Sequence, residues 1–339
     1  MRLRLGCLFS LMMLVATSSA ILSTKHAHNT FGGDSTSPGL EIAMLPTLFP
    51  VSHAANLLVL RNGDVLCFWF SGSEEGASDV AILVSRLPRD TKTWEAAVVV
   101  DGESGKSYQN PVPIEAADGS VWLLHTSQTA EKGQADAQVL KVISYDEGQH
   151  WSKPEALFAE AGSYIRQPIV VGYHGELLLP FYYSTSSGIT AGAETNYSSV
   201  KISNDLGNSW SECKVPHSEG LVQMDIIKVT SAGYLAFFRS RYADNIYRSD
   251  SPDGCHWADP TPTALPNNNA SIQAVRLTNG DLVLAFDNAV GTSKKRIPQT
   301  GPRFPLSVAL SKDIGKHWIA VRDLEVGPEV RRAEANSSN

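Results

Sequence analysis

The sequence predicts an all-β fold, a β-propeller of four-stranded antiparallel sheets. Glycine-containing turns recur 56, 56, 58 and 47 residues apart, and a tryptophan follows each of them. Repeats of this length that hold several strand-like runs are typical of propeller blades. Amphipathic periods of helical length are absent, so each repeat is expected to consist of strands. The turn glycines are Gly63, Gly119, Gly175, Gly233 and Gly280, and the tryptophans are Trp94, Trp151, Trp210, Trp257 and Trp318.

The second repeat shows the expected order of strands most clearly. Its strand-like runs cover residues 110–115, 120–127, 137–144 and 153–158, and the pair Asp118-Gly119 joins the first two as a hairpin. The same order recurs in the later repeats. We therefore expect a single propeller domain over residues 41–326, in which each repeat forms one antiparallel sheet.

A turn motif, Ser-x-Asp-x-Gly-x-x-Trp, closes four of the repeats, once in a form that is one residue shorter. Its carboxylate can accept backbone N–H groups across the turn, its glycine can take a positive φ, and its tryptophan can pack between neighbouring sheets. We expect the aspartates of these turns to be structural and not catalytic. They are Asp146, Asp205, Asp253 and Asp313.

The two ends of the chain differ in composition from the repeats. Residues 1–20 contain two arginines, then an apolar run, then small residues, which is the order of a secretory signal peptide. Residues 21–40 are expected to form a flexible leader, and residues 327–339 a polar C-terminal tail. The protein is therefore expected to be secreted or to reside in the lumen of the secretory pathway.

A secreted chain folds in an oxidising compartment where glycans and disulfides form. Asn196 and Asn269 begin Asn-x-Ser triplets and are candidate glycosylation sites. Removal of the signal peptide would leave Cys67, Cys213 and Cys255, which allow at most one disulfide. Because Cys67 lies in an apolar run, it is expected to be a buried thiol.

The composition excludes several classes of partner and cofactor. The formal net charge is −7 and no basic block is present, which argues against nucleic acid and against an anionic membrane surface. No segment after the signal peptide is long and apolar enough for a transmembrane helix. No metal-ligand spacing, phosphate-binding glycine loop or serine-hydrolase motif is present, so we expect no metal and no cofactor. A carbohydrate or glycoconjugate partner meets no electrostatic opposition, and the sequence does not indicate the oligomeric state.

Polar residues recur where the first strand of each repeat begins. Propeller ligands bind at one end of the central channel, near the innermost strands, so these residues are expected to line a polar site. The alternatives are a structural imidazole and an internal ion pair for the histidine and the arginine of this set. The residues are His53, Gln109, Arg166, Gln223 and Asn269.

The turn motifs are similar to the Asp-box, or bacterial-neuraminidase repeat, and residues 52–326 resemble the sialidase-like propeller superfamily. Several short segments look like one branch of secreted and bacterial members of that superfamily. The resemblance implies a six-bladed β-propeller, whose last blade is expected to be incomplete in this chain, and a site for terminal sugars of glycans. The segments are residues 52–54, 72–76, 166–168, 265–269 and 303–307.

The resemblance also suggests roles for individual residues. Sialidases hold the carboxylate of the substrate with three arginines, transfer protons with an aspartate, and attack the sugar with a tyrosine that a glutamate activates. Arg239 and Arg303 match the second and third arginines, and Gln223 stands in the place of the activating glutamate. The first arginine has no counterpart, and His53 lies in that neighbourhood. The segment that bears the tyrosine is missing, so we expect either that both termini build the last sheet or that the chain is part of a longer protein.

An acidic loop after the second strand of the first repeat matches the region of the catalytic aspartate of sialidases. It contains Glu74, Glu75 and Asp79, and Asp79 directly precedes a strand as the aspartate of the superfamily does. The other interpretation is a solvated acidic loop. Asp79 and Glu75 are therefore candidates for the general acid/base.

We expect an exo-α-sialidase type glycoside hydrolase that acts on terminal acidic sugars. Two alternatives stay open: a uronate-specific polysaccharide lyase with His53 as base, and a catalytically inactive propeller that binds glycans. The candidate catalytic residues are Asp79, Glu75 and His53, and the candidate substrate-binding residues are Arg166, Arg239, Arg303, Gln223, Gln109 and Asn269.

Overall fold

The structure is a computed structural model. It describes residues 43–184, 195–229, 233–291 and 303–326. Within these ranges the chain forms strands and one short 3-10 helix, η2 (Gly133–Asp136), as an all-β fold requires. No helix in the described ranges is long and apolar enough to cross a membrane.

Three expected segments lie outside the described residues: the signal peptide at 1–20, the leader at 21–40 and the tail at 327–339. They stay predictions. The described residues form two compact units, which divide between residues 161 and 162. We call them the N-terminal and the C-terminal unit.

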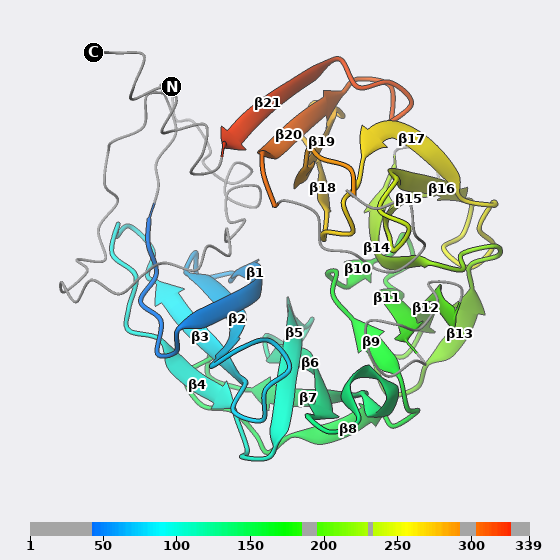
Figure 1. Ribbon diagram of the computed structural model, residues 1–339. Coiled ribbons are helices and arrows are strands. Elements are labelled where there is room, and N and C mark those ends of the chain that lie inside the picture. Colours follow the sequence, from blue (N-terminus) through cyan, green and yellow to red (C-terminus); the bar gives the residue numbers. More distant parts are fainter. Residues whose placement is uncertain (1–42, 185–194, 230–232, 292–302, 327–339) are drawn as a thin grey trace, which may run out of the picture. The chain divides into compact units, whose positions relative to one another are not determined.

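The N-terminal unit contains two antiparallel sheets of four strands, each joined in sequence order (Figure 1). The strands of the first sheet are β1 (Val51–Val59), β2 (Val65–Gly72), β3 (Ala81–Leu87) and β4 (Val98–Asp101). Those of the second are β5 (Lys106–Glu115), β6 (Val121–Thr129), β7 (Gln138–Ser144) and β8 (Glu155–Phe158). These four strands match the four runs that the sequence predicts for the second repeat.

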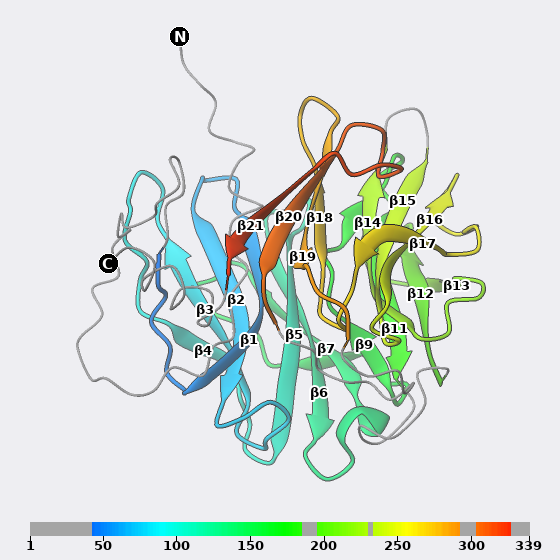
Figure 2. The ribbon, with the colours of Figure 1, turned by 45° about the horizontal axis from the view of Figure 1, so that its top comes forward.

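The C-terminal unit contains three antiparallel sheets, also joined in sequence order (Figure 2). In the first of them the innermost strand is divided into β9 (Ser163–Ile165) and β10 (Val170–Val171), which both pair with β11. The other strands of that sheet are β11 (Leu177–Ser184), β12 (Asn196–Ser203) and β13 (Ser211–Lys214). The second sheet has β14 (Leu221–Lys228), β15 (Tyr234–Ser240), β16 (Asn245–Ser251) and β17 (Thr261–Pro266), and the third has β18 (Gln273–Arg276), β19 (Leu282–Asp287), β20 (Leu306–Ser311) and β21 (Ala320–Glu325).

The prediction of four-stranded antiparallel sheets is confirmed, but within the described residues the predicted number of six sheets is not met. The described residues build five sheets. The reason lies in the repeats themselves, because the sequence has five glycine turns and each of them joins the first two strands of one sheet. No further turn of this kind is available for a sixth sheet within the described ranges.

The glycine turns work as hairpin turns because their backbone takes a conformation that other residues avoid. Gly63, Gly119 and Gly280 have φ values of 96°, 89° and 93°. At the second of these turns, the N–H of Gly119 donates to the carbonyl of Ala116 over 3.0 Å, and the N–H of Ala116 donates to the carbonyl of Ser120 over 2.8 Å. A side chain at such a φ would be strained, so the glycines fix where each hairpin reverses.

The four Ser-x-Asp turns use the same pattern of hydrogen bonds. At the first turn, the hydroxyl of Ser144 accepts the N–H of Gly148 over 2.7 Å and donates to Asp146 over 2.8 Å. Asp146 Oδ1 also accepts the N–H of His150 over 2.9 Å. The equivalent bonds recur at Asp205, Asp253 and Asp313. All four carboxylates therefore hold their own turns in place.

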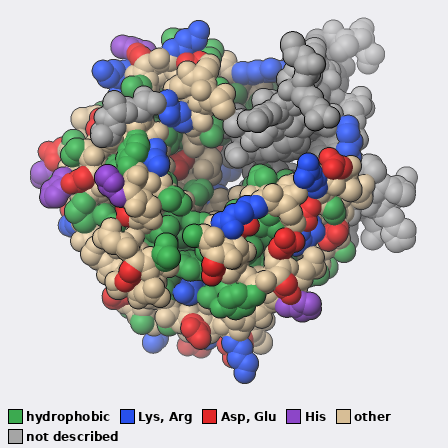
Figure 3. Space-filling model, turned by 180° about the vertical axis from the view of Figure 1, so that it is seen from behind, with side chains coloured by type: hydrophobic (Ala, Val, Ile, Leu, Met, Phe, Trp, Pro, Cys, Tyr) green, Lys and Arg blue, Asp and Glu red, His purple; other side chains and the backbone are tan. Residues whose placement is uncertain are grey.

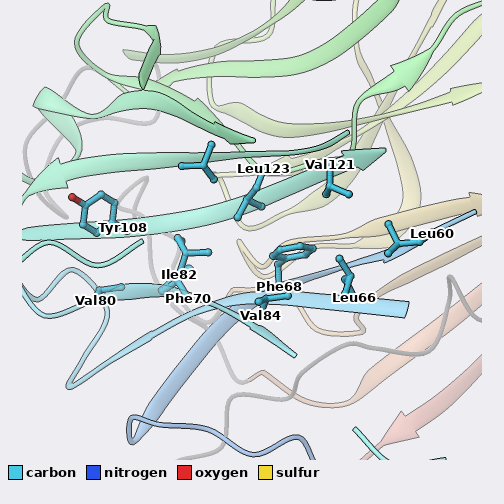
Figure 4. Close-up of a cluster of buried hydrophobic side chains, with 11 residues drawn as sticks. Leu60, Leu66, Phe68, Phe70, Val80, Ile82, Val84, Tyr108, Val121 and Leu123 are labelled. Carbon is cyan, nitrogen blue, oxygen red and sulfur yellow. The ribbon is translucent and has the colours of Figure 1, made fainter. Parts of the chain in front are cut away.

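One core cluster of the N-terminal unit lies between its two sheets. Side chains of β2 and β3 meet those of β5 and β6 in one cluster (Figure 4). Phe68 is completely buried there, and the ring of Trp151, from a Ser-x-Asp turn, packs edge-on against it with 5.8 Å between ring centres. The turn tryptophan thus joins its own sheet to the neighbouring one, as the motif predicts.

The C-terminal unit contains one disulfide. Cys213, on β13, is bonded to Cys255, which lies in the Ser-x-Asp turn of the next sheet, and 42 residues separate them in sequence. Cys67 is a buried free thiol, and burial raises its pKa to about 12. The disulfide therefore links the edges of two neighbouring sheets.

On the face that Figure 3 shows, charged side chains of both signs are scattered among other residues. No block of one sign dominates this face, in agreement with the scattered Lys, Arg, Asp and Glu residues of the sequence.

Candidate functional site

The innermost strand of every sheet is irregular near the predicted polar positions. Bulges interrupt β1, β5 and β14, and Ala54, Asn110 and Gln223 take positive φ values of 54°, 52° and 52° within them. Asn269, just before β18, has φ 63°, and residues 166–169 divide β9 from β10. Bulges of this kind redirect side chains and are common beside functional sites. Each predicted polar residue therefore lies at, or directly before, such an irregularity.

Arg239 is the centre of a polar group in the C-terminal unit. It lies on β15, and its Nε donates to Asn269 Oδ1 over 2.8 Å. Its Nη1 donates to Gln223 Oε1 over 3.2 Å. Both amides are almost completely buried, at 3% and 8% exposure, and they orient the guanidinium without adding a negative charge. Three of the predicted site residues are thus in direct contact.

Asp287 brings a second arginine into this group. The carboxyl ends β19, is 8% exposed, and accepts the Nδ2 of Asn268 over 3.2 Å. Burial raises the pKa of Asp287, while Asn268 and the charges of Arg303 and Arg239 act in the opposite direction. One carboxyl therefore lies in the field of two of the predicted arginines. The N–H of Asn288 donates to the carbonyl of Pro305 over 2.8 Å, which ties the segment that follows Arg303 to the end of β19.

Residues 267–269 connect Arg239 to Asp287, because Asn269 accepts a hydrogen bond from Arg239 and Asn268 donates one to Asp287. The amide oxygen of Asn267 accepts the N–H groups of Ser240 and Asn269, each over 3.1 Å, and its Nδ2 donates to the carbonyl of Ala270. These contacts tie the end of β15 to the segment before β18. They place Asn268 and Asn269 so that each can bind a charged side chain.

Arg166 lies within the electrostatic influence of an internal carboxyl group, that of Asp225. It follows β9, where burial lowers its pKa to about 10 and electrostatic interactions with Tyr182 and Asp225 oppose that change. Asp225, on β14, is 4% exposed, and its Oδ2 accepts the N–H of Ala274 over 2.6 Å. Burial raises the pKa of Asp225 to about 7, with Ala274 and Arg166 opposing the rise. β14 therefore carries one group that acts on Arg166 and another that binds Arg239.

His53 and Gln109 lie in the N-terminal unit. The ring of His53, on β1, stacks on Phe70 with 5.2 Å between ring centres and 17° between planes. Gln109, on β5, is 7% exposed, and its Nε2 donates to the hydroxyl of Ser107 over 3.2 Å. Both side chains have structural contacts, and their part in a site with the arginines stays a prediction.

Asp79 and Glu75 lie in an exposed loop of the same unit. Asp79 accepts the hydroxyl of Ser73 over 2.9 Å and the N–H of Ser73 over 3.2 Å. These bonds close the loop between β2 and β3. Asp79 thus has a structural role, to which the predicted acid/base role would be additional, and Glu75 is exposed in the loop that it closes.

The candidate glycosylation sites are buried. Asn196, on β12, and Asn269 are each 3% exposed, and Asn269 also binds Arg239. A glycan on either amide would displace these packed neighbours. The folded structure therefore disfavours glycosylation at both positions.

Sequence reasoning missed Asp225, Asp287 and Asn268. The signal for Asp287 was a carboxyl that ends an apolar strand ahead of Arg303, and the signal for Asp225 was its place two residues after Gln223. Among the residues that the structure describes, no group of three His, Cys, Asp or Glu side chains could hold a metal ion.

Comparison with known proteins places the chain among sialidase-like folds. A family model described as "BNR repeat-like domain" matches residues 63–336. No curated protein matches the sequence. Among solved structures, the Hadza microbial sialidase Hz136 has a TM-score of 0.65 at 15% identity, with 82% of this chain and 60% of that chain covered.

Two further structures have the same fold at similar identity. The NanB sialidase from Streptococcus pneumoniae has a TM-score of 0.64 at 11% identity, with 88% of this chain and 63% of that chain covered. The intramolecular trans-sialidase from Ruminococcus gnavus has a TM-score of 0.62 at 12% identity, with 82% and 86% covered. The chain thus spans less than two thirds of the length of the first two sialidases. At these identities the likeness shows the propeller fold alone.

Proposed function

Because this chain belongs to the BNR repeat-like domain family, we propose that it binds a terminal acidic sugar of a glycan and hydrolyses its glycosidic bond as an exo-α-sialidase type enzyme. The observation that carries the proposal is the arrangement around Asp287. Two guanidinium groups, those of Arg239 and Arg303, act on one carboxyl at the end of β19. Two arginines that act on one carboxyl of the protein can offer the same charges to the carboxylate of a sugar.

The geometry of the amides supports binding of a carboxylate. A guanidinium binds a carboxylate best when its plane is fixed, because two parallel N–H donors can then face both oxygens. Gln223 and Asn269 hold Arg239 through its Nη1 and its Nε, so its orientation is set before a ligand arrives. Such preorganisation lowers the entropy cost of binding.

The remaining assignments extend this proposal to the reaction. Arg166 and Gln109 would line the site, and Asp79 or Glu75 would act as general acid/base, with His53 as the other candidate for proton transfer. The proposal places the protein outside the cell or in the secretory lumen. The disulfide between Cys213 and Cys255 supports that location, since such bonds persist in oxidising compartments.

A second candidate function is glycan binding without hydrolysis. It is favoured by Gln223, whose amide oxygen accepts a hydrogen bond from Arg239 in the place where the resemblance expects a glutamate. An amide cannot take up a proton at neutral pH, so it cannot activate a tyrosine as a carboxylate would. Binding with no turnover would select this function.

The test combines a binding assay with a turnover assay. We would measure binding of an α-sialoside and of a uronide by calorimetry, and hydrolysis of their fluorogenic forms. Truncation of Arg239 to alanine should weaken binding by roughly ten- to a hundredfold, because a charge-assisted hydrogen bond contributes about 1.5–3 kcal/mol. The matched control is Arg322→Ala, which removes an exposed arginine from the outermost strand β21.

The outcomes separate the candidates. Loss of binding in the Arg239 variant alone supports the carboxylate site, and release of the fluorophore by the unchanged protein supports hydrolysis. A product that absorbs in the near ultraviolet would indicate a lyase. Equal affinity of both variants for the acidic sugars would refute the proposed site.

A further inference from the structure

The carboxyl of Asp287 interacts with the same two arginines that are proposed to bind the carboxylate of the ligand. The carboxyl lies in the field of Arg239, from β15, and of Arg303, from the segment before β20. Its third neighbour, Asn268, is neutral and donates through Nδ2. These three residues are the groups that act on Asp287 from neighbouring elements. With both arginines charged and Asp287 ionised, the cluster has one net positive charge.

A ligand carboxylate at the two arginines would meet this internal carboxylate. Two carboxylates that share a site rarely stay ionised together, because their repulsion is not screened by water in a buried place. Asp287 is 8% exposed, so little solvent is available to screen it. Burial already raises its pKa in the absence of a ligand, and a second anion would raise it further.

We propose that Asp287 takes up one proton from solvent when an anionic sugar binds, and that it thereby makes recognition of the ligand dependent on pH. The inference rests on the proposed function, since it concerns the same two arginines. The protonated carboxyl can donate its O–H to an oxygen of the bound ligand, while both arginines become available to the ligand carboxylate. A neutral sugar would bring no charge and would cause no proton uptake.

Linkage fixes the direction of the effect. If the ligand raises the pKa of Asp287, then protonation of Asp287 must strengthen the binding of the ligand by the same factor. Affinity should therefore rise as the pH falls, by at most about tenfold per pH unit for one proton. The site would favour acidic compartments for this reason.

The experiment measures proton uptake directly. Calorimetric titrations with a methyl α-sialoside, with glucuronate and with acetate would be run between about pH 5 and pH 8, in buffers that differ in ionisation enthalpy. We expect an uptake that approaches about one proton per bound anion. Asp287→Asn keeps an acceptor for Asn268 but carries no charge, so it should bind the anions at least as tightly, with no uptake and no dependence on pH.

The matched control is Asp281→Asn. Asp281 directly precedes β19, at the opposite end of the strand from Asp287, and it accepts the Nδ2 of Asn279 over 2.9 Å. This variant loses the same charge and should retain the proton uptake. Thermal unfolding would check that both variants fold. If Asp287→Asn does not fold, the proton uptake measured on the unchanged protein still tests the inference.

The outcomes distinguish this inference from the proposed function. Binding of the acidic sugars without proton uptake overturns the inference and leaves the proposed function standing. Proton-linked binding of acetate without binding of either acidic sugar would overturn acidic sugars as ligands in both proposals, and would leave only the coupling of a small anion to Asp287. Failure of all three anions to bind overturns both.

Discussion

Removal of the disulfide between Cys213 and Cys255 should destabilise the C-terminal unit by a predictable amount. The bond closes a loop of 42 residues between β13 and the Ser-x-Asp turn of the next sheet. In the chain-entropy description, a loop of this length removes about 13 cal/mol/K from the unfolded state, which corresponds to about 4 kcal/mol at room temperature. We therefore expect the double variant Cys213→Ala/Cys255→Ala to lose about 4 kcal/mol in its free energy of unfolding.

The assay is denaturation in guanidinium chloride, followed by tryptophan fluorescence, with and without a thiol reductant. The reductant should shift the midpoint of the unchanged protein to that of the double variant and leave the variant itself unaffected. Because Cys67 is buried and unbonded, it does not complicate the comparison. A difference below about 1 kcal/mol between the oxidised and reduced protein would refute the reasoning, since loop closure would then not govern the contribution.

Three further predictions concern stability. Hydrogen bonds from His317 hold the pKa of Asp313 below its ordinary value, so the contribution of Asp313 to stability is present above about pH 4 and is lost as the pH falls further. In melting temperatures measured over this pH range, Asp313→Asn should remove that acid-dependent loss. The pKa of Asp225 is raised from 3.8 to about 7, so the protein should lose stability as the pH rises between these values, and Asp225→Asn should flatten that slope in denaturant titrations at several pH values. Phe68→Ala should cost about 3–5 kcal/mol in the free energy of unfolding, because it leaves a cavity against Trp151; a loss below about 1 kcal/mol would show that the cluster collapses around the gap.

Local features made the fold predictable. The positive φ of Gly119 and the hydrogen bonds of Asp146 involve residues within a few positions of each other, so the sequence contains all the partners. The strands of the second repeat were also predictable, because their apolar runs and the Asp118-Gly119 turn between the first two are local features of the sequence. The expectation of six sheets came from the resemblance and not from the turns, which number five.

The site was predictable only in part. The sequence predicted Arg239 and Arg303 as site residues, and in the structure both act on the carboxyl of Asp287. The sequence did not predict a role for Asp287. Arg166 was expected either to line the polar site or to form an internal ion pair, and the sequence did not indicate that Asp225 is the carboxyl that acts on its charge. The catalytic role of Asp79 stays a prediction, and the hydrogen bond from Ser73 by which this carboxylate closes its own loop was not anticipated.

The sequence by itself determined the repeat, the strand order within each sheet and the turns that close them, because short-range hydrogen bonds and backbone conformation decide these features. Tertiary structure alone decided which charges act on each other. Asp225 accepts the N–H of Ala274, which lies 49 residues further along the chain, and Asn268 donates to Asp287, 19 residues further along. Such hydrogen bonds form only when sheets and strands have packed together. Burial, which moves the pKa of both carboxyls, exists only once that packing has formed.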